Sequence, residues 1–131
     1  MRLVLDTNVI VAAFAARGLC AEVFEVCITG HVLVTSEHIL AEVGRGLLKK
    51  VRLPNRIIRD VLDYLRDTAE IVEPDLINMS LCRDKDDLPI LGTATKGNAS
   101  CIVTGDSDLL SLKTYMAIDI ITPREFWDRL R

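Results

Sequence analysis

Carboxylates follow two short apolar segments of this 131-residue chain. Asp6 comes directly after the apolar residues 3–5, and Asp106 and Asp108 come shortly after the segment 100–104. Burying a carboxylate is unfavourable unless a partner compensates its charge. Because ligand sites in parallel sheets lie at the carboxyl ends of the strands, we expect these side chains to line a common crevice.

Two further acids are expected to reach the same crevice. Asp87 begins a helical pattern after the polar loop 80–86. Glu42 lies on another predicted helix, whose apolar stripe consists of Ile39, Leu40, Val43 and Leu47. At about 100° per residue, Glu42 falls on the shoulder of that stripe, from which a side chain can reach the edge of a buried crevice.

Carboxylates that converge repel one another and raise one another's pKa unless a cation is present. Mg²⁺ and Mn²⁺ are the divalent cations that prefer such hard oxygen ligands. Ions of this kind activate water and stabilise the charge that develops on a phosphoryl group. The chain shows no Cys or Ser with a partnering His for a nucleophilic triad. The acidic set therefore indicates metal-assisted phosphodiester hydrolysis.

Each acid taken alone also has a structural interpretation. Asp6 could cap the helix that follows it, and Asp86 or Asp87 could cap the helix after the polar loop. Asp106 and Asp108 could form a turn after a strand, and a glutamate on the shoulder of a helix is commonly solvated. The combination of acids favours the metal site more strongly than any one of them does.

Strand and helix patterns alternate along the chain and would position these acids. Strands are expected at 2–6, 31–34, 71–72, 100–104 and 118–121, and helices at 8–16, 20–29, 36–48, 55–68, 87–96 and from Pro123 onward. This alternation predicts one α/β domain over residues 1–131, with a parallel sheet and helices on both faces. Gly92 interrupts a predicted helix and is expected to permit close packing against a strand.

Charge is segregated along a chain whose net charge is −3. The segment 45–59 holds no acid and six basic residues, namely Arg45, Lys49, Lys50, Arg52, Arg56 and Arg59. Many of the acids lie instead between Asp84 and Asp108. Such segregation can place a basic face beside an acidic pocket, as a nucleic-acid backbone requires, and a solvated helical face is the alternative.

The cysteines and the hydropathy indicate the setting of the protein. The four cysteines form no CxxC pair and the chain has only two histidines, which argues against a zinc site. Cys27 and Cys101 lie in apolar surroundings and are expected in the core. With no signal-peptide pattern and no apolar run of about 20 residues, we expect a reduced, soluble, cytoplasmic protein that does not contact a membrane.

Four blocks in order carry a resemblance to a known family. They are LVLDTNVIVAAF, TSEHILAEV, RDKDDLPILGTA and CIVTGDSDLL, the last followed by IITPREF. The chain resembles the PIN-domain ribonucleases, in particular the small bacterial and archaeal toxins of toxin–antitoxin systems (VapC-like). The resemblance implies a three-layer αβα sandwich and Mg²⁺- or Mn²⁺-dependent cleavage of single-stranded RNA. It also implies a homodimer and a cognate antitoxin protein as partner.

The family's functional residues map onto this sequence position by position. The catalytic acids would be Asp6, Glu42, Asp87 and Asp106, and the metal ligands Asp6, Asp87, Asp106 and Asp108. Asp87 is chosen over Asp84 and Asp86 because Ile90 and Ala94 follow it at the family's spacing. Thr7, Asn8 and Thr104 match the small polar residues that orient the carboxylates.

Arg45, Lys49, Lys50 and Arg52 are the residues that we expect to contact RNA. The main alternative is a PIN-like module that binds RNA or protein without catalysis, against which the complete acidic set argues. Receiver-type and haloacid-dehalogenase-type domains fit less well. The first needs an acid adjacent to Asp6 and the second needs an Asp at position 8, where this chain has Asn8.

Overall fold

A computed structural model describes residues 1–130 and contains a six-stranded sheet. Its strands are β1 (Arg2–Leu5), β2 (Val32–Thr35), β3 (Glu70–Ile71), β4 (Cys101–Val103), β5 (Thr114–Tyr115) and β6 (Ile118–Ile121). The strand order is β3-β2-β1-β4-β6-β5, and every pair is parallel except the antiparallel pair β5–β6. The prediction of a mostly parallel sheet is confirmed.

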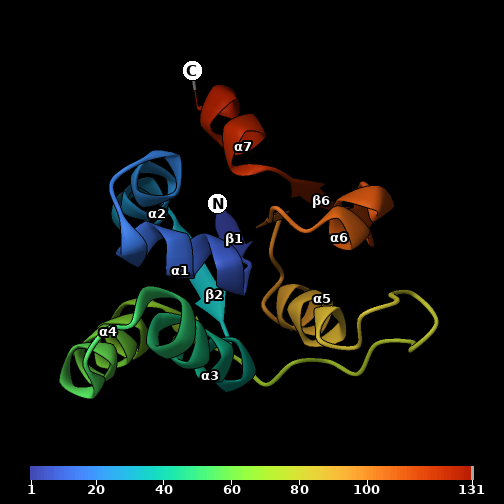
Figure 1. Cartoon of the computed structure of the whole chain (residues 1–131). Coiled ribbons are helices and arrows are strands. Elements are labelled where there is room, and N and C mark those ends of the chain that lie inside the picture. The colour runs from blue at the N-terminus through green and yellow to red at the C-terminus, as the bar shows by residue number, and fades with distance from the viewer. Residues whose placement is uncertain (131) are drawn as a thin grey trace.

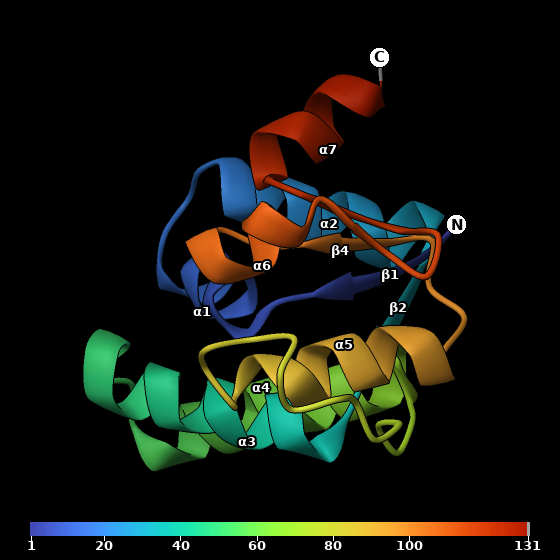
Figure 2. The ribbon, with the colours of Figure 1, turned by 90° about the vertical axis from the view of Figure 1, so that its right-hand side faces the viewer.

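Helices cover both faces of the sheet. They are α1 (Thr7–Ala15), α2 (Leu19–Gly30), α3 (Glu37–Gly46), α4 (Asn55–Thr68), α5 (Asp87–Lys96), α6 (Ser107–Leu112) and α7 (Pro123–Arg129). In Figure 1, α5 and α6 lie to the right of β1 and β2, and α1, α2 and α4 lie to the left, with α7 packed against α2. Figure 2 shows α5 beneath the strands, beside α3. The three-layer αβα architecture is therefore confirmed.

Strands β1 and β4 lie side by side at the centre of the sheet and bring their following residues together. Leu5 pairs with Val103, and the Asp6 N–H donates to the Val103 carbonyl at 2.9 Å. Residues 3–5 and 101–103 are all buried, as the near-continuous apolar runs of a central parallel strand require. The pairing register thus places Asp6 beside Thr104 at the carboxyl edge of the sheet.

The helix predicted at 36–48 has a different end. Ser36 caps α3 by accepting a hydrogen bond from the Ile39 N–H, and the α-helix then ends at Gly46. A π-helical turn, Leu47–Val51, follows and closes with Arg52 in the left-handed conformation at φ 62°. Burial of Leu47 anchors this wider turn, which helical periodicity alone does not reveal.

Asp106 and Asp108, which could have formed a turn after the strand, instead lie at the start of a further helix. Asp106 accepts a hydrogen bond from the Leu109 N–H at 2.9 Å and caps α6. Strand β5 follows α6 and was also not predicted. Both elements are too short, at six and two residues, to show a periodic pattern in the sequence.

Cys27 and Cys101 are buried in the core, as predicted. Burial raises the pKa of the Cys27 thiol to about 12 and that of Cys101 to about 11, which keeps both thiols protonated and unreactive. All four cysteines are free, and within residues 1–130 no cysteine belongs to a cluster of potential metal ligands. No helix in the described part of the chain is long and apolar enough to cross a membrane.

Gly92 permits a close approach, but to a loop rather than to a strand. A Cβ atom at this position would lie 2.2 Å from the Asp75 carbonyl oxygen and 3.1 Å from Pro74 Cβ. The Gly92 carbonyl also accepts a hydrogen bond from the Asp75 N–H at 3.0 Å. The expectation of packing against a strand is wrong, because the segment after β3 crosses α5 at this point.

We expect Gly92→Ala to lower the free energy of unfolding by about 1–3 kcal/mol, because the added methyl group displaces the backbone of residues 74–75. Denaturation in urea measures the change. Gly30→Ala is the matched control, because the structure leaves open space around a Cβ atom at Gly30. An alanine at position 92 that is as well tolerated as one at position 30 would contradict this close packing.

Candidate metal centre

Four of the predicted acids line one pocket of about 130 Å³, namely Asp6, Glu42, Asp87 and Asp106. Each comes from a different element. Asp6 follows β1, Asp106 lies between β4 and α6, Asp87 is the first residue of α5, and Glu42 lies in the middle of α3. The sheet edge and the two flanking layers therefore meet at this pocket, which Thr7 and Asn8 also line.

The Thr104 hydroxyl connects Asp6 to Asp106. It donates to Asp6 Oδ2 at 2.6 Å and accepts the Asp106 N–H at 2.9 Å. Asp6 Oδ1 accepts the Thr7 N–H at 2.7 Å, so this carboxylate also caps α1. Burial raises the pKa of Asp6, whereas the hydrogen bonds from Thr104 and Thr7 lower it. Asp6 therefore caps α1 and also lines the acidic pocket.

Asp87 is the least compensated of these acids. Its side chain is buried, with 7% of the residue exposed, and Oδ2 has no hydrogen-bond partner. Burial, and next the charge of Asp106, raises the pKa of the Asp87 carboxyl to about 7. The position before α5 belongs to Asp86, whose side chain makes no capping hydrogen bond. Helix capping therefore explains neither residue.

Asp108 lies at the edge of this arrangement. One oxygen from each of Asp87, Asp106 and Asp108 lies within 4.8 Å of the others. Asp108 is also 3.4 Å from the exposed guanidinium of Arg83, and it is not among the residues that line the pocket. The structure thus brings Asp108 close to two of the predicted ligands while leaving it partly neutralised by a cation.

Glu42 points to the pocket from the opposite layer. Burial raises its pKa, and the nearby His38 lowers it, with His38 Nε2 3.1 Å from Glu42 Oε1. Sequence reasoning missed His38, although its spacing of four residues before Glu42 places both on one face of a helix. Such a neighbour restricts the positions that the Glu42 side chain can adopt.

Asp84 and Asp86 also line the pocket. Both are exposed, whereas Asp87 is buried. The Asp84 side chain accepts the Asp86 N–H at 2.9 Å, which helps to shape the turn before α5. These two acids add negative charge at the mouth of the pocket.

A basic groove of about 240 Å³ adjoins the acidic pocket and shares Thr7, Asn8 and Glu42 with it. Arg45, Lys49 and Lys50 line this basic groove, and Lys50 Nζ donates to Asn8 Oδ1 at 3.4 Å. The structure does not bring Arg52 to it, because Arg52 ends the π-helical turn in the left-handed conformation. Three of the four predicted RNA contacts are thus adjacent to the acids.

The donor set fits a hard divalent cation. The acids contribute carboxylate oxygens, which suit Mg²⁺ or Mn²⁺. The orphaned Oδ2 of buried Asp87 points to the same conclusion, because such an atom ordinarily has a hydrogen-bond or metal partner. A cation here would also relieve the repulsion that raises the pKa of Asp87.

Comparison with known protein families agrees with this arrangement. A family model described as the PIN domain matches residues 2–108, which include all the acids described above. The chain belongs to the PIN domain family. The resemblance to PIN domains inferred from the four sequence blocks is therefore confirmed. No curated protein matches the sequence of this PIN domain.

Two solved structures share the fold of this PIN domain. The first is VapBC2 from Rickettsia felis bound to a DNA fragment from its promoter, with a TM-score of 0.64 and 19% identity over 93% of this chain and 98% of that one. The second is VapBC-1 from nontypeable Haemophilus influenzae, with a TM-score of 0.65 and 18% identity over 95% of this chain and 99% of that one.

We expect Asp87→Asn to stabilise the metal-free protein. Because the pKa of Asp87 is raised from 3.8 to about 7, the folded state holds a proton that the unfolded chain releases, and stability falls as the pH rises through this window. At about pH 8 the substitution should raise the free energy of unfolding by about 1–2 kcal/mol, less than the full pKa shift would give because the pocket is open to water.

Urea denaturation in EDTA measures this change, with Asp60→Asn on the exposed face of α4 as the control. Mn²⁺ should stabilise the wild type more than it stabilises Asp87→Asn. A loss of stability in Asp87→Asn without metal would show that the Asp87 charge is compensated in some other way.

Proposed function

We propose that this PIN domain is a Mg²⁺- or Mn²⁺-dependent endoribonuclease that hydrolyses phosphodiester bonds of single-stranded RNA. The observation that carries the proposal is the convergence of Asp6, Glu42, Asp87 and Asp106 on one pocket, with a buried, unpartnered oxygen on Asp87. A module that only binds RNA or protein has no need of four carboxylates held together against their mutual repulsion.

Asp6, Asp87 and Asp106, with Asp108 at the edge, would hold the metal. When bound, the metal lowers the pKa of water and offsets charge on the phosphoryl oxygens. Thr104 orients Asp6 through its hydroxyl and positions the backbone of Asp106. Glu42, whose raised pKa reflects its burial, lies across the pocket and is suited to accept a proton from the attacking water.

The basic groove gives the RNA backbone a path to the acids. Arg45, Lys49 and Lys50 are cations beside a site that would act on a phosphodiester. Phosphate contacts from Lys and Arg supply affinity without sequence preference. The basic residues that are segregated in the sequence thus lie together along α3 and the π-helical turn after it.

Partners follow from the same proposal. Both of the solved structures described above are named VapBC, a name that joins two components. We infer that this chain is the toxin of a toxin–antitoxin pair, that it binds a cognate antitoxin protein, and that it forms a homodimer. Co-purification with the product of the adjacent gene, followed by a mass measurement, tests these partners.

We expect Asp6→Asn to reduce cleavage of a labelled single-stranded RNA by about 100-fold or more, a loss of roughly 3 kcal/mol of transition-state stabilisation. Asp6 is the acid that Thr104 and Thr7 hold at the pocket, and an amide is a weaker metal ligand. The assay contains Mn²⁺, and EDTA should abolish wild-type cleavage. Equal activity in wild type and Asp6→Asn would refute the nuclease assignment.

We expect the pair Lys49→Glu and Lys50→Glu to weaken RNA binding by about tenfold and to reduce the salt slope of binding by about 1.4, at roughly 0.7 per phosphate contact for single strands. Fluorescence anisotropy in the Asp6→Asn background measures both. The matched control is Arg56→Glu with Arg59→Glu, two exposed cations of α4. A similar loss in both pairs would favour a diffuse charge effect over the basic groove.

A further inference from the structure

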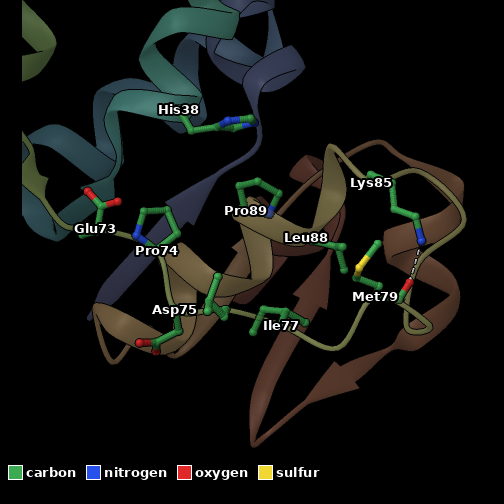
Figure 3. Close-up of a pocket in the computed structure, with 10 residues that line it drawn as sticks. His38, Glu73, Pro74, Asp75, Ile77, Met79, Lys85, Leu88 and Pro89 are labelled. Atoms are coloured by element: carbon green, nitrogen blue, oxygen red, sulfur yellow. Dashed lines mark hydrogen bonds between the residues drawn. The ribbon is translucent and has the colours of Figure 1, made fainter.

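An apolar pocket of about 480 Å³ opens next to the acidic pocket. The first turn of α5 contributes Leu88 and Pro89, the segment after β3 contributes Pro74 and Ile77, and α3 contributes His38 (Figure 3). Apolar atoms dominate this lining. We call it the proline pocket.

The proline pocket touches the acidic pocket at two places. His38 forms part of its wall and lies 3.1 Å from Glu42, which lines the acidic pocket. Leu88 directly follows Asp87 in the first turn of α5. Adjacent residues of α5 thus line the two pockets, so a ligand in the acidic pocket would lie next to the proline pocket.

Three different hollows follow one another along α3 and the turn after it. His38 borders the proline pocket, Glu42 borders the acidic pocket, and Arg45 and Lys49 border the basic groove. The spacing 38, 42 and 45 repeats at four and three residues, which places these side chains on one face of α3, each about one turn of 5.4 Å from the next. Lys49 follows in the π-helical turn and also lines the basic groove. Along α3 the proline pocket therefore comes first, the acidic pocket second and the basic groove third.

We propose that the proline pocket binds the nucleobase next to the scissile phosphate. This inference rests on the proposed ribonuclease function. A single-stranded nucleotide presents a charged backbone and an apolar base face, and the row along α3 offers a cationic groove, a site for the scissile phosphate and an apolar recess in that order. Sequence readout of RNA characteristically uses unstacked bases that leave the strand and enter pockets.

The polar groups at the rim indicate which bases fit. Lys85 Nζ already donates to the Met79 carbonyl at 2.9 Å, and Asp75 accepts from the Thr95 hydroxyl at 2.8 Å. Among the described residues, the Glu73 carboxylate has no such partner, and it is an acceptor only. The pocket should prefer adenine, cytosine or guanine, whose exocyclic amino group can donate to this carboxylate, over uracil, whose free base edge donates only through the ring N3–H.

The test is cleavage of a randomised single-stranded RNA pool by the full chain in Mn²⁺, read by sequencing the product ends. The wild type should disfavour uracil by about tenfold at one position flanking the cleaved bond. Ile77→Trp fills the proline pocket and should reduce this preference to within about twofold, while cleavage stays dependent on Mn²⁺. Met116→Trp, at an exposed residue of a different pocket, is the matched control.

A second measurement leaves the protein unchanged. A defined RNA with an abasic site at the preferred position should be cleaved by the wild type about tenfold more slowly, in kcat/KM, than the intact RNA. The same abasic site should cost Ile77→Trp less than about twofold, because the base contact is already lost there. Such non-additivity is the signature of a direct contact.

Other results would overturn the inference. Cleavage without base preference, or a preference that neither Ile77→Trp nor the abasic site changes, rejects the base-binding role and leaves the ribonuclease assignment intact. If Ile77→Trp dissociates a dimer, measured by sedimentation, and leaves base preference unchanged, a second copy covers the proline pocket instead. Absence of cleavage by the wild type rejects the proposed function and this inference with it.

Discussion

The arrangement of the whole structure depends on holding several carboxylates in one partly buried pocket. Asp6 and Asp87 are buried, Asp106 lies within reach of both, and burial raises the pKa of the first two. Left to themselves, such groups would separate or move into water. The backbone prevents this, because Asp6 is tied to Val103 by the sheet and Thr104 links Asp6 to Asp106. Burying these carboxylates together costs stability, which a bound cation would restore.

Two of the acids that line the pocket also have a structural role. Asp6 caps α1 and Asp106 caps α6, so the helices that follow β1 and β4 both begin at the pocket. The positive end of each helix lies beside a negative side chain, which partly offsets the repulsion. Asp87 also sits at a helix start but caps nothing, and its free oxygen is the strongest sign of a missing partner. This division distinguishes carboxylates fixed by the fold from the one that needs a ligand.

Helix α3 organises the surface around the pocket. Its buried side, Ile39, Leu40 and Val43, packs into the core, and its other side passes three hollows of different chemistry. Gly46 lets α3 approach α1, since a Cβ atom there would lie 2.8 Å from a methyl group of Val11. The π-helical turn then redirects the chain so that Lys49 and Lys50 face the basic groove while Leu47 stays buried. The basic groove and the core packing thus depend on the same short segment.

The sequence by itself determined the element order and the parallel sheet, because apolar strands and amphipathic helices leave a local pattern. It also determined the acids that line the pocket, because the carboxyl ends of parallel strands meet at one edge of the sheet. Its spacing to Ile90 and Ala94 favoured Asp87 over Asp84 and Asp86, but the sequence did not show which of the three is buried. It also did not reveal α6, the π-helical turn or the contact between His38 and Glu42. Tertiary structure decided these, since burial, the loop that crosses Gly92 and the meeting of α3 with α5 join residues far apart in the chain. Local pattern places a side chain on an element, and only packing decides what that side chain faces.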